Sequence, residues 1–216
     1  MKPGHFFPHR EEILSASREE LPDVIRRLVD QGQTGSTSAT QGLDVWKDIP
    51  SGSKIWLGTT SSKLPLDLGS YGLITFEQAD KPSIETLKRE AILGPSEELV
   101  LRLQEGKKKK TDLDYPTQVL PAVVEFARRI RAQDRPIFIR DWTGKSLSVG
   151  AAVCLSWMFV QDDLVARPSI DEAVPTPSKE DLRKRLEWIL NERQGANPSR
   201  LVLKSVNEYL ISAKYK

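Results

Sequence analysis

The sequence has few of the residues that build redox or metal chemistry. Among 216 residues there are one cysteine and two histidines. Cys154 cannot form an internal disulfide, so we expect a reducing compartment, and its place in an apolar run predicts a small buried side chain. His5 and His9 lie near the N-terminus without a partnering cysteine. We therefore expect neither a metal site nor a Ser-His-Asp triad.

Long hydrophobic runs and a strong net charge are also missing. The most apolar run, residues 149–160, falls short of the ~20 residues that a membrane helix needs. The first ten residues lack the apolar core of a signal peptide, so we expect a cytoplasmic protein, with the nucleus as the alternative. With 32 basic and 30 acidic residues the net charge is only +2, so any footprint for nucleic acid must be local.

Composition divides the chain into three predicted parts. In residues 1–31 apolar side chains recur at helical spacing, punctuated by Pro22, which predicts a short helical extension. Residues 32–44 are mostly Gly, Ser, Thr, Gln and Ala and predict a flexible linker. Residues 45–216 hold enough apolar residues for one core, so we expect them to form a single domain.

Within the third part, strand and helix patterns alternate. Short β-prone runs predict strands at 54–58, 73–76, 99–103 and 136–140, and helical spacing predicts helices over 116–132 and 148–159. The second helix is apolar nearly all round, as in a core. Ser178, with Asp181 three residues on, predicts the capped start of a further helix, and a last helix follows Ser199. The alternation predicts an α/β fold with a central sheet flanked by helices.

One loop has the composition of an anion-binding turn. Residues 141–148 read Asp-Trp-Thr-Gly-Lys-Ser-Leu-Ser and join a predicted strand to the apolar helix. Such turns point free backbone N–H groups and a helix dipole at the crevice where α/β proteins bind ligands. We predict a phosphate-binding set made of Asp141, Trp142, Thr143, Gly144, Lys145, Ser146, Leu147 and Ser148. A simple helix N-cap is the alternative.

The same loop does not fit two known catalytic patterns. A nucleotide-triphosphatase loop needs a glycine where Ile139 stands. The loop of protein-tyrosine and dual-specificity phosphatases, Cys-x-x-Gly-x-x-Arg-Ser/Thr, matches at Gly144 and Ser148. Asp141, however, replaces its cysteine nucleophile, and Leu147 replaces the arginine that clamps phosphate. We therefore predict no catalytic residue here.

Some alternatives stay open around this loop. Asp141 could be an aspartyl-phosphate nucleophile, although no second carboxylate flanks it. In phosphatases of this kind a preceding loop supplies the general acid, which makes Asp112 and Asp114 candidates for a role that is empty without a nucleophile. The lysine run just before them is typical of a solvated loop or a nuclear-import signal, or it contacts nucleic-acid phosphates.

Several longer segments resemble one family. They read Ile-Trp-Leu-Gly-Thr-Thr at 55–60, Gly-Lys-Lys at 106–108, Gly-Lys-Ser-Leu-Ser-Val-Gly at 144–150, Leu-Arg-Lys-Arg-Leu-Glu-Trp-Ile at 182–189, Ala-Asn-Pro-Ser-Arg at 196–200 and Ser-Val-Asn-Glu-Tyr-Leu at 205–210. In these segments, and in Phe-Phe-Pro-His-Arg-Glu-Glu-Ile-Leu at 6–14, the chain resembles the initiator-tRNA 2′-O-ribosyl phosphate transferase family. The resemblance is to the carboxyl-terminal part of that family, which implies a dual-specificity-phosphatase-like domain.

The resemblance also implies a function. Members of the family transfer a ribosyl phosphate from phosphoribosyl pyrophosphate to a T-stem adenosine of initiator tRNA. The implied partners are initiator tRNA, a phosphate or ribosyl phosphate group, and an N-terminal transferase domain that this sequence does not match. We expect no cofactor in this chain and leave open whether the chain itself is an enzyme.

The residues expected to contact RNA are basic. They are Lys107, Lys108, Lys109, Lys110 and Arg200. Two other functions compete with tRNA recognition: an active or atypical phosphatase, and a module that only binds other proteins.

Overall fold

The computed structural model describes residues 20, 24, 46–49, 52–64, 69–91, 94–103, 113–162 and 174–212. The chain separates into two compact units, Met1–Gly42 and Leu43–Lys216, and every element described below belongs to the second. The predicted boundaries after residues 31 and 44, and almost all of the predicted extension and linker, lie outside the described residues. Those predictions stay open.

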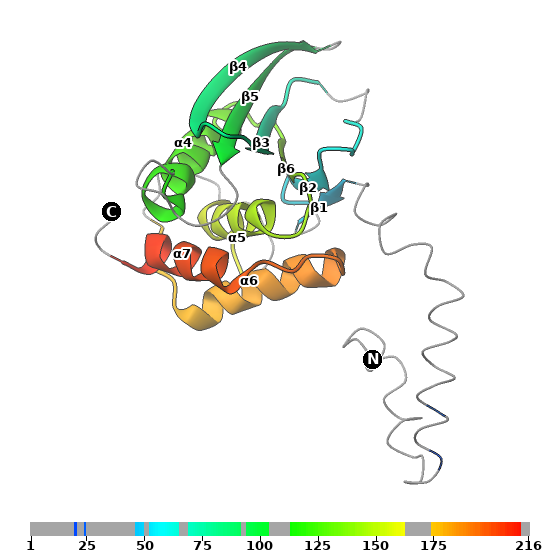
Figure 1. Cartoon of the computed structure of the whole chain (residues 1–216), viewed down its shortest axis with the longest axis vertical. Coiled ribbons are helices and arrows are strands. Elements are labelled where there is room, and N and C mark those ends of the chain that lie inside the picture. The colour runs from blue at the N-terminus through cyan, green and yellow to red at the C-terminus, as the bar shows by residue number, and fades with distance from the viewer. Residues whose placement is uncertain are drawn as a thin grey trace. The chain divides into compact units, whose positions relative to one another are not determined.

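The second unit is built on a six-stranded mixed sheet (Figure 1). The strand order is β1-β2-β6-β3-β5-β4, with β1 at Lys47–Asp48, β2 at Ile55–Thr59, β3 at Gly72–Gln78, β4 at Ser83–Ala91, β5 at Gly94–Leu103 and β6 at Ile137–Asp141. The four middle strands are parallel, and the two edge strands pair antiparallel with their neighbours. The predicted α/β class is confirmed, as are the four predicted strands.

The two edge strands are the ones that the sequence patterns did not predict. β4 reads Ser-Ile-Glu-Thr-Leu-Lys-Arg-Glu-Ala, in which charged residues interrupt the apolar ones. Charged side chains are tolerated on an edge strand because its outer side is unpaired, and there they oppose edge-to-edge aggregation. Its apolar residues Ile84 and Leu87 are exposed. β1 has only two residues, too few for any pattern.

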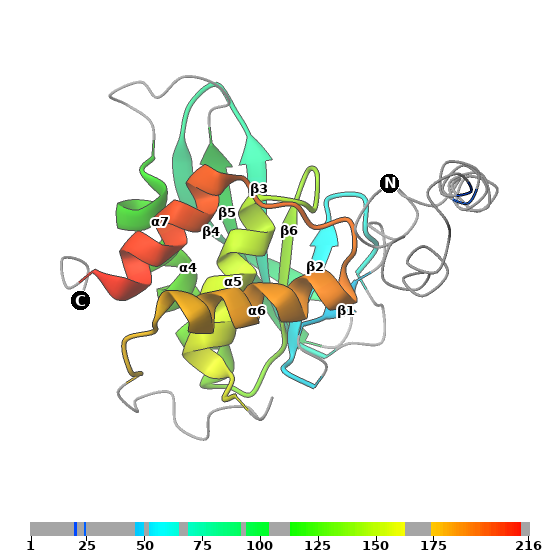
Figure 2. The same ribbon diagram turned by 90° about the horizontal axis from the view of Figure 1, so that it is seen from below.

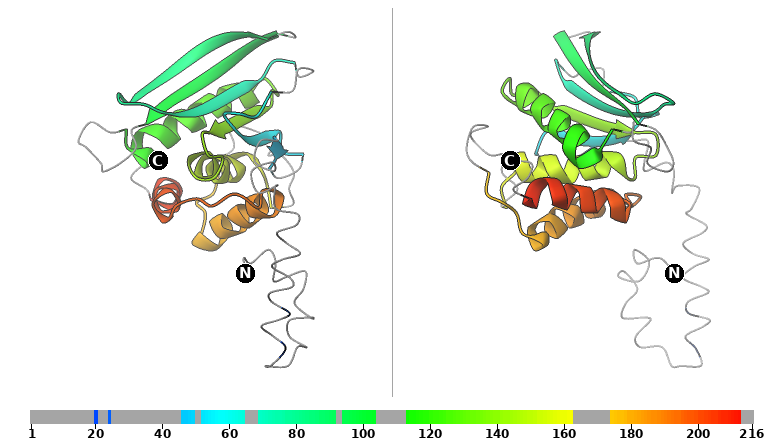
Figure 3. Two further views of the ribbon diagram at one scale, coloured as in Figure 1. Left: turned by 45° about the vertical axis from the view of Figure 1, so that its right-hand side comes forward. Right: turned by 60° about the vertical axis from the view of Figure 1, so that its left-hand side comes forward.

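The helices lie on one face of the sheet (Figures 1 and 3). They are α4 at Leu120–Arg131, α5 at Leu147–Phe159, α6 at Lys179–Glu192 and α7 at Arg200–Ile211. α5 lies between the sheet and the pair α6 and α7, which cross it in Figure 2. The helix predicted over 116–132 is confirmed for α4, but its first turn is π-helical, η2 at Tyr115–Val119. The predicted capping box is present, since Ser178 and Asp181 exchange hydrogen bonds at the start of α6.

Where β2, β6 and β3 lie, both faces of the sheet are packed, by different kinds of side chain. On the helical face, α5 is buried along almost its whole length, as its all-round apolar sequence predicts. On the other face Phe138 packs against Trp46, with ring centroids 4.9 Å apart, and stacks on Trp56 at 5.8 Å. Cys154 is fully buried in α5, and this burial raises the pKa of its thiol far above the ordinary value. Its predicted role as a small buried hydrophobe is confirmed.

No helix in the described part of the chain is both long and apolar enough to cross a membrane.

Candidate functional site

The turn of residues 141–148 lies at the carboxyl end of the central strand β6. Asp141 is the last residue of β6, and α5 begins at Leu147. β6 is flanked by β2 and β3, both parallel to it, so the turn opens where ligands bind in α/β sheets. Gly144 has φ +63°, and a Cβ there would stand 2.5 Å from the Arg193 guanidinium and 2.6 Å from the Thr59 methyl group. Only glycine fits this position.

The Asp141 carboxylate, only 1% exposed, lies inside the turn that follows it. Its Oδ1 accepts hydrogen bonds from the Thr143 N–H at 2.7 Å, the Thr143 hydroxyl at 2.9 Å and the Gly144 N–H. Its Oδ2 accepts from the Ser148 N–H at 2.9 Å and the Ser148 hydroxyl at 2.7 Å. The turn therefore surrounds an anion that belongs to the protein itself.

The donors expected to hold an external phosphate are thus directed at Asp141. A phosphate bound by the N–H groups of Thr143, Gly144 and Ser148 would have to displace a buried carboxylate of the same charge sign. Of the other members of the predicted set, Trp142 and Lys145 are exposed, and Ser146 and Leu147 are half-buried. Phosphate binding by this turn stays a prediction.

Leu147, at the position of the phosphatase arginine, also has apolar surroundings in the structure. Leu147 packs against the hydrophobic core at the first position of α5. The Leu147 carbonyl accepts a hydrogen bond from the Tyr115 hydroxyl at 2.8 Å. Burial raises the pKa of Tyr115 well above its ordinary value, so the phenol donates this bond in its neutral form.

The turn is held in place by a buried arginine. The sequence patterns did not indicate this residue. Arg193, which follows α6, is 2% exposed. Its Nε donates to the Gly144 carbonyl at 3.2 Å, and its Nη1 donates to the Leu57 carbonyl at 2.7 Å. It therefore ties the turn to strand β2 and to the connection between α6 and α7. Both of these acceptors are backbone carbonyls, so no sequence motif indicates these contacts.

The connection between α6 and α7 docks directly on the turn. The Asn197 N–H donates to the Lys145 carbonyl at 2.9 Å, and the Ser199 N–H donates to the Ser146 hydroxyl at 3.2 Å. The Ser199 side chain caps α7 by accepting from the Val202 N–H. Arg200 is the next residue. The structure thus brings together two predicted groups, the turn and the RNA-contact candidate Arg200.

The predicted general-acid candidate Asp114 makes hydrogen bonds away from the turn. Asp114 directly precedes η2; its carboxylate accepts from the Thr117 hydroxyl at 2.6 Å, and its N–H donates to the Gln118 side chain. Asp112, Lys107, Lys108, Lys109 and Lys110 lie outside the described residues. Among the residues that the structure does describe, no three His, Cys, Asp or Glu side chains cluster in a way that could hold a metal ion.

The pattern of this turn, in this fold, has known relatives. Residues 97–210 match the family model Init_tRNA_PT, described as the Rit1 DUSP-like domain. Among solved structures, DUSP15 is 13% identical with a TM-score of 0.50, over 80% of this chain and 91% of that one. This likeness confirms the predicted dual-specificity-phosphatase-like fold.

Two further structures are similar at lower TM-scores. The human tyrosine phosphatase-like serine/threonine/tyrosine-interacting protein is 16% identical, with a TM-score of 0.48 over 77% of this chain and 95% of that one. The Yvh1 phosphatase domain from Chaetomium thermophilum is 18% identical, with a TM-score of 0.45 over 76% and 94%. No curated protein sequence matches the chain.

Proposed function

Because this chain belongs to the Init_tRNA_PT family through its Rit1 DUSP-like domain, we propose that it recognises initiator tRNA for modification without hydrolysing phosphate. In this proposal the modification is transfer of a ribosyl phosphate from phosphoribosyl pyrophosphate to a T-stem adenosine. The transfer belongs to a separate N-terminal transferase domain. The phosphatase-like fold supplies a rigid surface that holds the tRNA.

The observation that carries the non-hydrolytic half is the buried Asp141 carboxylate. Cysteine-phosphatase chemistry needs a thiolate to attack phosphorus and a guanidinium to clamp the equatorial oxygens. Here the nucleophile position holds a carboxylate whose two oxygens accept five hydrogen bonds, and Leu147 at the arginine position packs into the core. A phosphoryl group at this place would meet negative charge and no clamp.

The recognition half rests on basic side chains around the turn. Lys145 and Arg200 are both exposed, and the hydrogen bond between Ser199 and Ser146 keeps their backbones close. Of the phosphate-binding set predicted from the sequence, we assign phosphate contact to Lys145 and Ser146, while Asp141, Gly144 and Ser148 hold the turn in shape. Lys107, Lys108, Lys109 and Lys110 add positive charge to the same proposed function.

Binding to tRNA tests the recognition half. The full chain is titrated into fluorescently labelled initiator tRNA, and anisotropy is followed as the salt concentration rises. We expect the logarithm of the association constant to fall linearly with the logarithm of salt, by roughly 0.7 to 0.9 for each phosphate contacted. A chain that is folded by circular dichroism yet shows no salt-sensitive binding to this tRNA would overturn the proposed recognition.

Hydrolysis of an aryl phosphate tests the other half. We expect no vanadate-sensitive turnover from the wild-type chain. The matched variant carries Asp141→Cys together with Leu147→Arg, which puts the two missing groups back into the pattern, and it serves as the comparison in the same assay. Turnover by the wild type that vanadate abolishes and Asp141→Asn removes would show an active phosphatase.

A further inference from the structure

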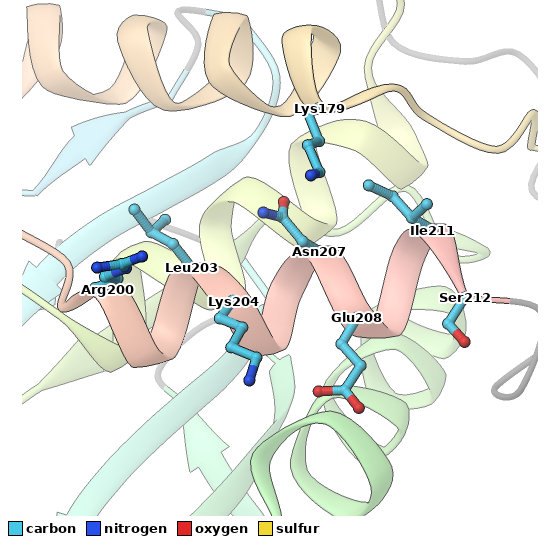
Figure 4. A pocket seen from close by; sticks show the side chains of 8 residues that line it. All are labelled: Lys179, Arg200, Leu203, Lys204, Asn207, Glu208, Ile211 and Ser212. Carbon is cyan, nitrogen blue, oxygen red and sulfur yellow. The ribbon is translucent and has the colours of Figure 1, made fainter.

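A groove lies between the start of α6 and the outer side of α7 (Figure 4). Its volume is about 510 Å³. It is lined by Lys179 from α6 and by Arg200, Leu203, Lys204, Asn207, Glu208, Ile211 and Ser212 from α7 and its end. None of these residues belongs to the phosphatase pattern or to the 141–148 turn. Arg200 follows Ser199, whose N–H donates to the Ser146 hydroxyl of the turn.

The cations of the groove have no acidic partner among the described residues. Lys179, Arg200 and Lys204 are exposed, and within the described part of the chain no carboxylate forms an ion pair with any of them. By contrast, the three cations further along α6 all pair with carboxylates, those of Glu180 or Asp162. The groove therefore presents three cations with which no described carboxylate forms an ion pair.

The lining residues of α7 form two rows. Leu203, Asn207 and Ile211 recur every four residues and point toward α6, where Lys179 reaches down toward Asn207 (Figure 4). Arg200 and Lys204 begin the outer row, about 6 Å apart along the helix axis at 1.5 Å per residue. The groove thus has an apolar floor with one amide, a cationic rim on one side and a lysine on the other.

We propose that this α6–α7 groove binds the phosphate backbone of the tRNA. The proposal rests on the proposed function and names the surface that carries it out. Arg200, Lys204 and Lys179 would neutralise successive phosphates, because exposed unpaired cations release counterions from RNA most readily. Leu203 and Ile211 offer apolar surface to a ribose.

The floor and the surroundings favour RNA over an acidic peptide. The Asn207 amide both donates and accepts hydrogen bonds, which suits a ribose 2′-hydroxyl or a base edge. Lys145 on the turn is a further exposed cation, and the Ser199 N–H next to Arg200 donates to the Ser146 hydroxyl next to Lys145. Glu208 follows Lys204 in the outer row and points away from Lys179 in Figure 4, so the cationic part of this row is limited to Arg200 and Lys204, at the start of α7.

Charge reversal tests the groove. The double variant Arg200→Glu, Lys204→Glu of the full chain is titrated with labelled initiator tRNA beside the wild type. We expect affinity to fall about ten-fold or more and the salt dependence to become shallower by about one to two contacts. The control is Lys81→Glu, Lys88→Glu, which makes the same change of charge. These two lysines lie in β4 and just before it, and β4 is on the opposite side of α5 from α7 (Figures 1 and 3). We expect the control to lose no more than about two-fold.

Lysine footprinting on the wild type gives a second measurement that needs no variant. Acetylation of Lys179 and Lys204 should slow when tRNA is bound, while Lys88 reacts as before. One outcome is that the wild type binds tRNA while the groove variant binds as tightly as the control and the two lysines are not protected. In that case the assignment of RNA binding to the groove is wrong, and the proposed function stands. If the wild type does not bind tRNA at all, the proposed function fails first. If an oligoglutamate peptide binds, and only its binding is lost in the groove variant, the occupant is a protein.

Discussion

The 141–148 turn and the α6–α7 groove are neighbours, because Arg200 of the groove follows Ser199, which contacts the turn. They differ in whether the protein itself pairs their polar and charged groups. In the turn, backbone N–H groups and hydroxyls that could hold an anion donate to the protein's own Asp141. In the groove, cations stand on the surface without carboxylate partners among the described residues. Groups satisfied internally fix a conformation, whereas exposed unpaired groups remain available to a partner. In our proposal the phosphatase-like fold keeps the shape of this turn, and the partner is recognised at the neighbouring groove.

The largest expected effect comes from removing the arginine that holds the closed turn. Arg193→Met should lower the free energy of unfolding by about 3 kcal/mol, because the buried carbonyls of Leu57 and Gly144 lose a charged donor. Urea denaturation measures this. The control Arg183→Met removes an exposed arginine that pairs with Glu180 and should cost less than about 0.5 kcal/mol. Equal losses in the two variants would show that the turn does not depend on Arg193.

The next effect tests whether the turn is closed by its own carboxylate. Asp141→Ala should cost about 2 kcal/mol, because the N–H groups of Thr143, Gly144 and Ser148 then lack an acceptor. We expect inorganic phosphate to stabilise this variant and not the wild type. At about 100 times the dissociation constant the gain is about 2.7 kcal/mol.

Thermal denaturation with and without phosphate reads out this difference. Asp141→Asn keeps the size of the side chain, leaves no room for phosphate, and serves as the control. If phosphate raises the melting temperature of the wild type as much as that of Asp141→Ala, the turn binds external anions. The proposed difference between the turn and the groove would then be wrong.

A smaller loss of stability is expected from the capping box at the start of α6, the helix that begins with Lys179 of the groove. Ser178→Ala removes the acceptor of the Asp181 N–H and should cost about 1 kcal/mol in urea denaturation. The Ser178 backbone N–H, followed by its side chain, holds the pKa of Asp181 below its ordinary value of 3.8. Because the folded pKa is the lower one, the stabilisation is present above pH 3.8 and is lost as the pH falls through the folded value.

The matched control for this pH dependence is Asp181→Asn. The stability difference between wild type and Asp181→Asn should be constant near neutral pH and vanish in acid. A difference that persists at the lowest pH at which both remain folded would assign the stabilisation to something other than the carboxylate charge. Capping is local, so the rest of the core should unfold with an unchanged denaturant slope.

The smallest effect lies where the two regions meet. Lys145→Ala should weaken tRNA binding about three-fold and reduce the salt dependence by about one contact, because one exposed ammonium is lost. Lys63→Ala, an exposed lysine outside the turn and the groove, is the control and should change nothing measurable. If Lys145→Ala weakens binding more than the double variant in the groove does, the turn is the main RNA contact and the comparison is reversed.

Local patterns predicted most of this fold. The four strands β2, β3, β5 and β6 have clear apolar runs, α5 is apolar all round, and Ser178 with Asp181 marks the start of α6. These signals depend on residues near one another in the chain. β4 escaped prediction because its charged residues belong on a sheet edge, and the π-helical first turn at Tyr115 has no pattern of its own.

The site was less predictable because its contacts join distant segments. The sequence shows that Asp141 stands at the nucleophile position. It does not predict that the Asp141 carboxylate accepts a hydrogen bond from Ser148, seven residues later. Arg193 meets backbone carbonyls 49 and 136 residues away, which no spacing rule reveals. The groove joins two helices whose approach depends on the whole core. Phosphate contact by the turn and RNA contact by the lysines at 107–110 stay predictions.

The contact of Arg193 with Leu57 also has a consequence for the order of folding. Contacts between segments far apart in sequence form slowly, because the chain between them must first lose much of its conformational freedom. β2 leaves the ribosome early, the turn much later and Arg193 later still. During synthesis the turn therefore lacks its arginine until α6 has emerged, so we expect it to be among the last parts of the domain to gain protection from hydrogen exchange.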